Sequence, residues 1–232
     1  MAKTPVRTRR SGSQLSREAI IEASLRIAAR GSGDAFTVRR LGEELGADPT
    51  AVYRHFRDKD ELLLSVADRV YGEVIESVPD GLGWKDRLRA LADASLRIAL
   101  KYPAVASITG SRTTRRINEF RLVEFILGAV GEAGLDGADA ALHYRAFADA
   151  LLAHVAQAAA YALFSPEVRA GDESSWGREY RTVDPELFPR ITRLNAELAE
   201  IRPGPVYTVQ VEALIAAIEA RAASAAGDAP RT

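Results

Sequence analysis

The residues best suited to chemistry in this 232-residue chain lie between Thr37 and Lys59. Leu41 and Leu45 place apolar side chains four positions apart, and Thr37 stands where a helix cap is expected. Gly46 follows, a residue type that accepts the left-handed conformation in which helices commonly end. The segment therefore predicts a short helix that ends in a tight turn.

A second short helix is expected directly after that turn. Asp48 is a good acceptor for a helix N-terminus, and Pro49 suits the first helical position, where a missing N–H costs nothing. Val52 and Phe56, four residues apart, are expected to face the interior. The outward side chains are Thr50, Ala51, Tyr53, Arg54 and His55. They can hydrogen-bond, stack and carry charge, and a helix of about two turns with such an edge has the shape that enters a DNA major groove.

The whole segment resembles the DNA-binding signature of TetR-family transcriptional regulators. The matching pattern is Leu41-x3-Leu45-Gly46-x6-Tyr53-x-His55-Phe56-x2-Lys59, followed by Glu61-Leu62-Leu63. The likeness extends from Ser16 to about Val78, and beyond that only the length and the all-helical pattern agree. The resemblance implies a sequence-specific regulator, most simply a repressor, whose partner is a palindromic double-stranded DNA operator.

The resemblance also assigns roles within the DNA-binding segment. The positions that usually contact backbone phosphates are Tyr53, His55 and Lys59. The positions that often approach base edges are Arg39, Pro49, Thr50, Ala51 and Arg54. Arg54 departs from the aromatic residue common at its position, so its role as a guanine reader is inferred from guanidinium chemistry. Tyr53 can equally pack as a core aromatic, and Pro49 can serve helix geometry alone.

Composition is consistent with this function and excludes several others. Residues 1–60 hold 12 Lys and Arg against 8 Asp and Glu, whereas the rest of the chain holds 19 against 24. The most basic part, residues 1–14, is expected to be a disordered arm that contacts DNA or is simply solvated. Without cysteine there is no disulfide or thiolate chemistry. No apolar run suggests a membrane span or signal peptide, so a cytoplasmic protein is expected.

The hydrophobic pattern predicts an all-α protein with about nine or ten helices. Residues 15–62 are expected to form a three-helix helix-turn-helix domain, and a helix over 60–78 links it to a helical regulatory and dimerisation domain over 79–226, followed by a frayed tail over 227–232. The further helices are expected at 84–101, 104–108, 116–133, 138–164, 185–201 and 206–225. Residues 165–184 are expected to be a mobile connection, and Pro203-Gly204-Pro205 to separate the last two helices.

Two of these helices, 138–164 and 206–225, have apolar residues around more of their circumference than one core contact requires. The surplus predicts a homodimer in which two helices from each chain form a bundle, as the resemblance also implies. The alternative is that both helices are central in a monomeric core.

The resemblance implies a small-molecule effector in the C-terminal domain, and the aromatic and polar side chains there suit a largely apolar or aromatic compound. The candidate ligand-binding residues are Tyr102, Phe120, Phe125, His143, Tyr144, Phe147, His154, Gln157 and Tyr161. His143 and His154 lie eleven residues apart, too far along one helix to share a metal ion, so neither a metal nor a cofactor is expected.

Two alternatives to the effector-controlled regulator remain at this stage. A ligand-independent or protein-responsive DNA-binding regulator has the same N-terminal signature. A helical enzyme that binds a small molecule is the more distant alternative, because the chain has no glycine-rich phosphate loop, nucleophile elbow or paired-histidine metal motif. No catalytic residue is therefore expected.

Overall fold

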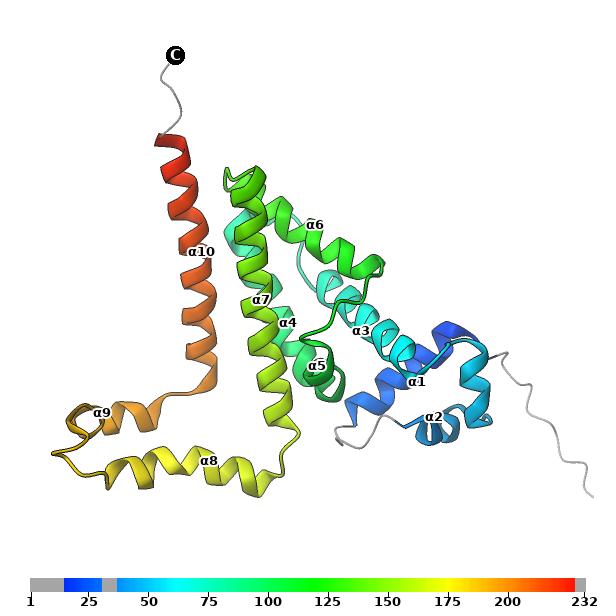
Figure 1. The fold of residues 1–232 in the computed structure, drawn as a ribbon, viewed down its shortest axis with the longest axis horizontal. Coiled ribbons are helices and arrows are strands. Elements are labelled where there is room, and N and C mark those ends of the chain that lie inside the picture. Colours follow the sequence, from blue (N-terminus) through cyan, green and yellow to red (C-terminus); the bar gives the residue numbers. More distant parts are fainter. Residues whose placement is uncertain (1–14, 31–36, 228–232) are drawn as a thin grey trace, which may run out of the picture.

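The structure, a computed structural model, describes residues 15–30 and 37–227 of the chain (Figure 1). Within these ranges it contains only helices, so the expected all-α class is confirmed. In chain order the helices are α1 (Arg17–Ala29), α2 (Val38–Leu45), the 3-10 helix η1 (Pro49–Arg54), α3 (Lys59–Glu76), α4 (Trp84–Lys101), α5 (Pro103–Thr109), α6 (Ile117–Glu132), α7 (Gly137–Ala162), α8 (Pro166–Arg178), the 3-10 helix η2 (Glu179–Arg181), α9 (Pro189–Glu200) and α10 (Pro203–Gly227). The expected basic arm over residues 1–14 and the last five residues lie outside the described ranges.

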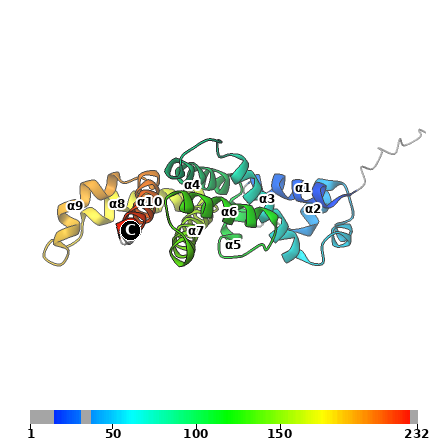
Figure 2. The ribbon, with the colours of Figure 1, turned by 90° about the horizontal axis from the view of Figure 1, so that it is seen from above.

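The helices form an elongated molecule whose two ends are built from different parts of the chain. Helices α1 and α2 lie at one end and α8 and α9 at the other, in both views (Figures 1 and 2). Helix α3 runs from the α1–α2 end into the body, where it packs against α4, α5 and α6. It is the helix expected to link the N-terminal helices to the rest.

One continuous hydrophobic core joins the N-terminal helices to the body. It includes Phe56 near η1, Leu62 and Val70 on α3, Leu91 on α4 and Phe147 on α7. Ten residues of α3 are buried. The helix is therefore stabilised along its length by packing as well as by the capping residues at its ends. Burial at both ends of α3 makes it a rigid connection.

The segment 165–184, expected to be a mobile connection, is mostly helical. The Ser165 hydroxyl accepts a hydrogen bond from the Val168 N–H at 3.4 Å, and Pro166 occupies the first helical turn, so local capping starts α8. None of the residues of α8, η2 or α9 is buried. The polar composition therefore marked an exposed helix, and the expectation of a loop was wrong.

The Pro203-Gly204-Pro205 segment also differs from expectation, because α10 begins at Pro203. Proline has no N–H to donate, and the first turn of a helix needs none, so both prolines fit within that turn. The break between the last two helices instead lies at Ile201 and Arg202. Ile201, the C-cap residue of α9, adopts an extended backbone with φ −61° and ψ 131°, which ends that helix.

Within the described part of the chain, no single helix combines the length and apolarity needed to cross a membrane. Only α7 taken together with residues 166–181, at a bend of 116°, passes that test by length and composition.

Candidate nucleic-acid interface

The turn between α2 and η1 is built by local signals. The Thr37 hydroxyl accepts from the Arg40 N–H at 3.3 Å, and Gly46 ends α2 with φ 61° and ψ 31°. Gly42 adds a packing requirement that the sequence analysis missed: a Cβ there would lie 2.9 Å from both the Ala47 carbonyl oxygen and Pro49 Cγ. Only glycine lets η1 approach α2 this closely, and a glycine inside a short helix was the available signal.

The start of η1 is capped by Asp48. Its Oδ1 accepts from the Thr50 hydroxyl at 2.6 Å and from the Thr50 N–H at 2.8 Å, and these two hydrogen bonds lower the pKa of Asp48. The hydroxyl proton of Thr50 is therefore engaged within the protein. Toward a base edge, this hydroxyl has only lone pairs to offer.

The residues of η1 divide cleanly by exposure. Val52 and Phe56 are both 1% exposed, whereas Tyr53 is 47% exposed, so its ring is not a core aromatic. Pro49, Thr50 and Arg54 are exposed as well, and Ala51 and His55 are half-buried. One edge of this element therefore faces solvent while the other holds it on the core.

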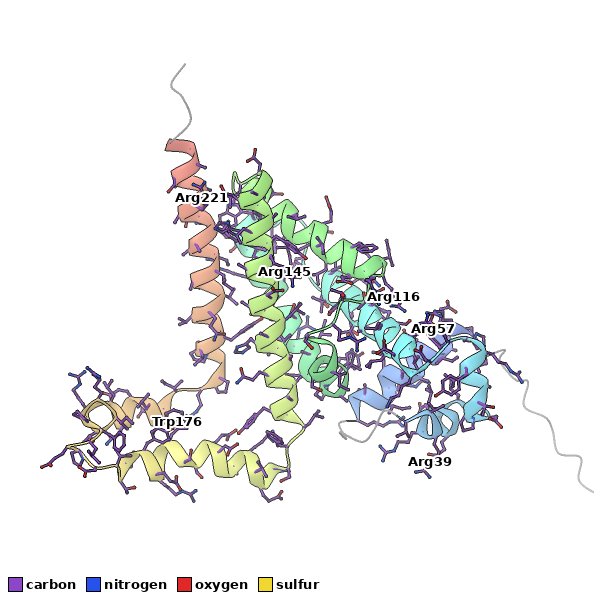
Figure 3. All side chains as sticks on the ribbon, in the orientation of Figure 1. Arg39, Arg57, Arg116, Arg145, Trp176 and Arg221 are labelled. Carbon is purple, nitrogen blue, oxygen red and sulfur yellow. The ribbon has the colours of Figure 1, made fainter. Side chains whose placement is uncertain are left out.

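Arg39 and Lys59, the two remaining candidate DNA contacts, flank η1 and are exposed. Figure 3 shows Arg39 on the outer edge of α2, at the end of the molecule away from α7 and α10. Its guanidinium lies 3.9 Å from Glu43, at the limit of a salt bridge between two well exposed side chains. Arg54 and Lys59 form no salt bridge with any residue that the structure describes. These cations are available to a polyanion.

Arg17 on α1 holds η1 in place through contacts on the protein side of the candidate interface, a role that the sequence did not indicate. Its Nη1 donates to the His55 carbonyl oxygen at 2.8 Å, and its Nη2 donates to Glu61 Oε1 and Ser65 Oγ, both at 2.9 Å. The guanidinium also lies 4.2 Å from the centre of the Phe56 ring. One side chain thus fixes the end of η1 against both α1 and α3.

The first turn of α3 is capped reciprocally. Asp58 Oδ1 accepts from the Glu61 N–H at 2.7 Å, and Glu61 Oε2 accepts from the Arg57 N–H at 2.8 Å. These backbone hydrogen bonds are the main reason that the pKa of each carboxyl lies below its usual value, with Arg57 and Arg17 adding to the effect on Asp58 and Glu61 respectively. Lys59 is therefore presented from a well-defined helix start.

A buried carboxylate joins α3 to α6. Asp68 is 6% exposed, and its Oδ1 accepts from the Thr114 hydroxyl at 3.1 Å, the Asn118 N–H at 3.1 Å and the Glu119 N–H at 3.0 Å. The cap residue of α6, Arg116, makes no side-chain capping hydrogen bond of its own. Asp68 therefore caps α6 from another helix, so the two helices are joined at this point.

The segment between α5 and α6 is also attached to the start of α3. Arg112 Nη2 donates to both carboxylate oxygens of Asp60, at 3.0 and 2.9 Å. Arg116, labelled in Figure 3, donates to the Glu61 carbonyl oxygen at 3.4 Å. A movement of this segment would therefore act directly on the helix that carries Lys59.

Two adjoining cavities lie beside this segment. One of about 140 Å³ has polar walls that include Arg112, Glu119 and Arg145. The other, of about 60 Å³, is lined mainly by apolar side chains of α3, α4, α5, α6 and α7. The residues shared by both are Tyr71, Gly110, Leu122, Ile126, Ala148 and Leu152. The shared walls make them the mouth and the inner end of one site.

A larger groove of about 470 Å³ lies between α7 and α10. Phe147, Leu151 and Val211 form part of its buried floor, and Ala153 and Ala213 are exposed lining residues. Small exposed residues on two neighbouring helices give a surface suited to another helix. The groove thus differs in kind from the two cavities inside the body.

The candidate ligand-binding residues fall into three groups. Tyr144 lines the 140 Å³ cavity. Phe147, His154 and Gln157 line the groove between α7 and α10. Tyr102, Phe120, Phe125, His143 and Tyr161 line none of these three spaces. The cavity residues that the sequence analysis missed, such as Tyr71 and Arg112, come from α3 and from the segment before α6, where no local pattern distinguishes a cavity wall from a core face.

The two histidines of α7 have other partners. The ring of His154 stacks on Tyr207 at 4.4 Å between centroids, and His143 Nδ1 lies 2.8 Å from the Asp139 carbonyl oxygen. Across the described ranges no group of three His, Cys, Asp or Glu side chains is arranged to hold a metal ion.

The candidate interface lies within the part of the chain that matches a protein-family model. The family model for bacterial regulatory proteins, tetR family, matches residues 20–66, which include α2 and η1. An HTH-type transcriptional regulator of Saccharopolyspora erythraea is 29% identical over 135 residues, which are 58% of this chain and 57% of that protein. The matched region thus spans little more than half the length of this curated relative.

Solved structures resemble nearly the whole chain. A structural genomics crystal structure from Streptomyces coelicolor A3(2) is 27% identical, has a TM-score of 0.73, and is matched over 90% of this chain and 99% of that chain. ActR from Streptomyces coelicolor in complex with actinorhodin has a TM-score of 0.77 over 90% of this chain and 99% of that chain. At 22% identity the second likeness shows the shared fold alone.

Proposed function

Because this chain belongs to the TetR family of bacterial regulatory proteins, we propose that it is a transcriptional repressor that binds a palindromic DNA operator as a homodimer and is released by a small effector. The exposed edge of η1 carries this proposal. Tyr53 and Arg54 face solvent while Val52 and Phe56 hold the same short helix on the core. A rigid element with stacking, hydrogen-bonding and cationic side chains on its outer edge suits a major groove.

The contacts divide by chemistry. Arg54 and Arg39 can each present a bidentate fork to guanine, whereas Lys59, Tyr53 and His55 suit phosphate oxygens. Pro49, Thr50 and Ala51 are small enough at the start of η1 to let its backbone approach the base edges. In a DNA-bound dimer the two η1 helices should lie about 34–36 Å apart, the spacing of successive major grooves on one face of the duplex.

We place the dimer contact on α7 and α10, which lie side by side in Figure 1 and border the 470 Å³ groove. Leu142 on α7 and Val209 on α10 are 65% and 69% exposed, although both are large apolar residues. An apolar surface of this kind on two neighbouring helices is covered when the same pair from a second copy packs against it. The expected segments 138–164 and 206–225 remain our choice for this interface.

We place the effector in the two adjoining cavities rather than in the groove. The cavities lie between α3, α6 and α7, so an occupant would touch the helix that carries Lys59. Actinorhodin in the complex of the structurally similar ActR supports a small-molecule effector, which favours this function over a ligand-independent regulator. The small volumes of about 140 and 60 Å³ imply that the helices move apart as the effector enters.

Selection of bound sequences from random duplex DNA tests the proposal. A palindrome should be recovered, and its half-sites should be separated by one helical turn or multiples of one. Arg54→Ala should relax selectivity at one base pair per half-site by about 1–3 kcal/mol, and Lys59→Ala should weaken binding to all sequences while lowering the salt slope by about one. Arg97→Ala is the matched control, because Arg97 is exposed on α4 and far along the chain from η1.

Sedimentation tests the dimer. Val209→Asp should shift the protein toward monomers and weaken operator binding, with unchanged helical content. Val168→Asp, also at an exposed apolar residue but on α8, should leave both properties unchanged. Recovery of no preferred duplex sequence at low salt would refute the proposed function, and a monomer that binds the operator fully would refute the dimer.

A further inference from the structure

One guanidinium connects the cavity mouth to the start of the helix that carries Lys59. Arg112 lines the 140 Å³ cavity, and its Nη2 holds both carboxylate oxygens of Asp60, at 3.0 and 2.9 Å. Asp60 is the second residue of α3, directly after Lys59. Any ligand atom that binds Arg112 from the cavity therefore acts one residue from a proposed phosphate contact.

The mouth has hydrogen-bond donors without protein acceptors. Arg112 uses only Nη2, and Arg145 uses only Nε, which donates to Asp149 at 2.7 Å. Within residues 15–30 and 37–227, the remaining N–H groups of both arginines make no hydrogen bond, nor does the hydroxyl of Tyr71. These donors come from three elements and all border the same cavity.

The carboxylates at the mouth are already bound by protein donors. Glu119 Oε2 accepts from the Thr114 hydroxyl at 2.9 Å and from the Arg115 N–H at 2.5 Å, and Asp149 accepts from Arg145. A ligand that supplies only acceptors therefore complements the mouth better than one that supplies donors. A carboxylate is such a group, and it matches the planar fork of arginine.

The inner cavity sets the rest of the ligand. Its walls include Val70, Val74, Ala99, Leu151 and Val155, and it offers few polar atoms. We propose that the effector is an amphipathic acid, with an apolar ring body in the inner cavity and a carboxylate that displaces Asp60 from Arg112. This inference rests on the proposed effector site and specifies the chemical class that the site recognises.

The exchange explains how an acid would weaken DNA binding. The side chains of Arg112 and Asp60 are 41% and 52% exposed, so their ion pair is weak and breaking it costs little free energy. Once Arg112 binds the ligand, the Asp60 carboxylate loses its partner beside Lys59. Its negative charge then repels the DNA phosphates, while Arg112 no longer attaches the segment before α6 to the start of α3.

The test uses two probes that share one ring body, 2-naphthylacetic acid and the uncharged 2-naphthylacetamide. Calorimetric titration of the full chain should show the acid binding at least tenfold more tightly than the amide. Arg112→Gln should remove this preference. Asp60→Asn should tighten acid binding, by up to about fivefold, because the competitor for Arg112 is weakened.

The controls separate recognition from folding. Arg97→Gln removes an exposed arginine of α4 and should preserve the preference for the acid. Arg112→Lys should retain part of it, since a charge remains without the planar fork. Equal binding of acid and amide, failure of both to bind, or weaker acid binding by Asp60→Asn would each overturn the proposal.

Operator binding is measured separately in gel-shift assays. Acid recognition by a protein that selects no DNA sequence would refute the proposed function and leave the acid site intact. Sequence-specific DNA binding that the acid fails to weaken, although the acid binds through Arg112, would refute the exchange with Asp60 alone.

Discussion

Substitution of Asp68 tests whether α3 and α6 form one mechanical unit. Asp68 is 6% exposed on α3, yet its carboxylate supplies the cap of α6. Asp68→Ala removes the acceptor of four donors at once, namely the Thr114 hydroxyl, the backbone N–H groups of Asn118 and Glu119, and the side-chain amide of Asn118. The Thr114 hydroxyl also lies within hydrogen-bond distance of Glu119. The other donors have no acceptor besides Asp68 among the residues that the structure describes.

The expected loss of stability follows from this geometry. A buried donor left unsatisfied costs about 1–3 kcal/mol, and a lost helix cap about 1 kcal/mol. Asn118 and Glu119 are only half-buried, so water can reach part of the site after the substitution. The gain in helix propensity from Asp to Ala returns roughly 0.5 kcal/mol. We therefore expect Asp68→Ala to lower the free energy of unfolding by about 3 kcal/mol.

Urea unfolding followed by circular dichroism measures this loss, and a thermal scan should show a fall in Tm of about 6–12 °C. Asp68→Asn should lose roughly half as much, because its amide oxygen can still accept from the backbone of α6. Asp93→Ala is the matched control, since Asp93 is an exposed carboxylate in the interior of α4. A loss for Asp68→Ala within about 0.5 kcal/mol of the Asp93→Ala value would refute the reasoning.

Three further predictions concern the same region. Gly110→Ala should destabilise the protein by roughly 1–3 kcal/mol in urea, because the added Cβ would lie 2.4 Å from a Cβ on α7, although the glycine φ of −60° suits alanine. The pKa of Glu61 is lowered by the Arg57 N–H and by Arg17. The Glu61 carboxylate therefore contributes to stability above pH 4.5, and this contribution is lost as the pH falls. Glu61→Gln should therefore flatten the acid side of the stability curve measured by urea unfolding across that range. Burial raises the pKa of Tyr71 to about 12, so the contribution of this residue to stability is present below pH 10.0 and is lost as the pH rises through 12. Tyr71→Phe should therefore remove one tyrosinate absorbance transition near pH 12 from the titration of the folded protein.

The N-terminal elements were predictable because their signals are local. Thr37, Gly46 and Asp48 each act on residues within a few positions of themselves, so their side chains and the intervening spacing define the turn before any tertiary contact is considered. Exposure of the η1 edge follows in turn from the burial of Val52 and Phe56. Local capping thus explains why sequence reasoning located the candidate interface.

Contacts between distant segments were not predictable in the same way. Arg17 binds His55 and Glu61 across 38 and 44 positions, and Asp68 caps a helix that begins 49 positions later. A charged residue in an amphipathic helix has the same local pattern whether it faces solvent or a distant backbone. The cavity walls were missed for this reason, whereas the α8 helix was missed because its residues bury nothing.

The geometry of α3 limits how an effector can control DNA binding. Asp60, Asp68 and Tyr71 all lie on this helix, and the first and last are separated by about 16 Å along its axis. A nearly complete switch requires the effector to prefer the released state by about 5.5 kcal/mol. Loss of the exposed Arg112–Asp60 ion pair supplies at most about 1 kcal/mol of that difference. The remainder has to come from apolar contacts in the inner cavity that move α6, and Asp68 transmits this movement because it attaches α6 to α3. An effector acid should accordingly lose most of its influence on operator binding in Asp68→Ala, which removes this attachment, even where the acid still binds through Arg112.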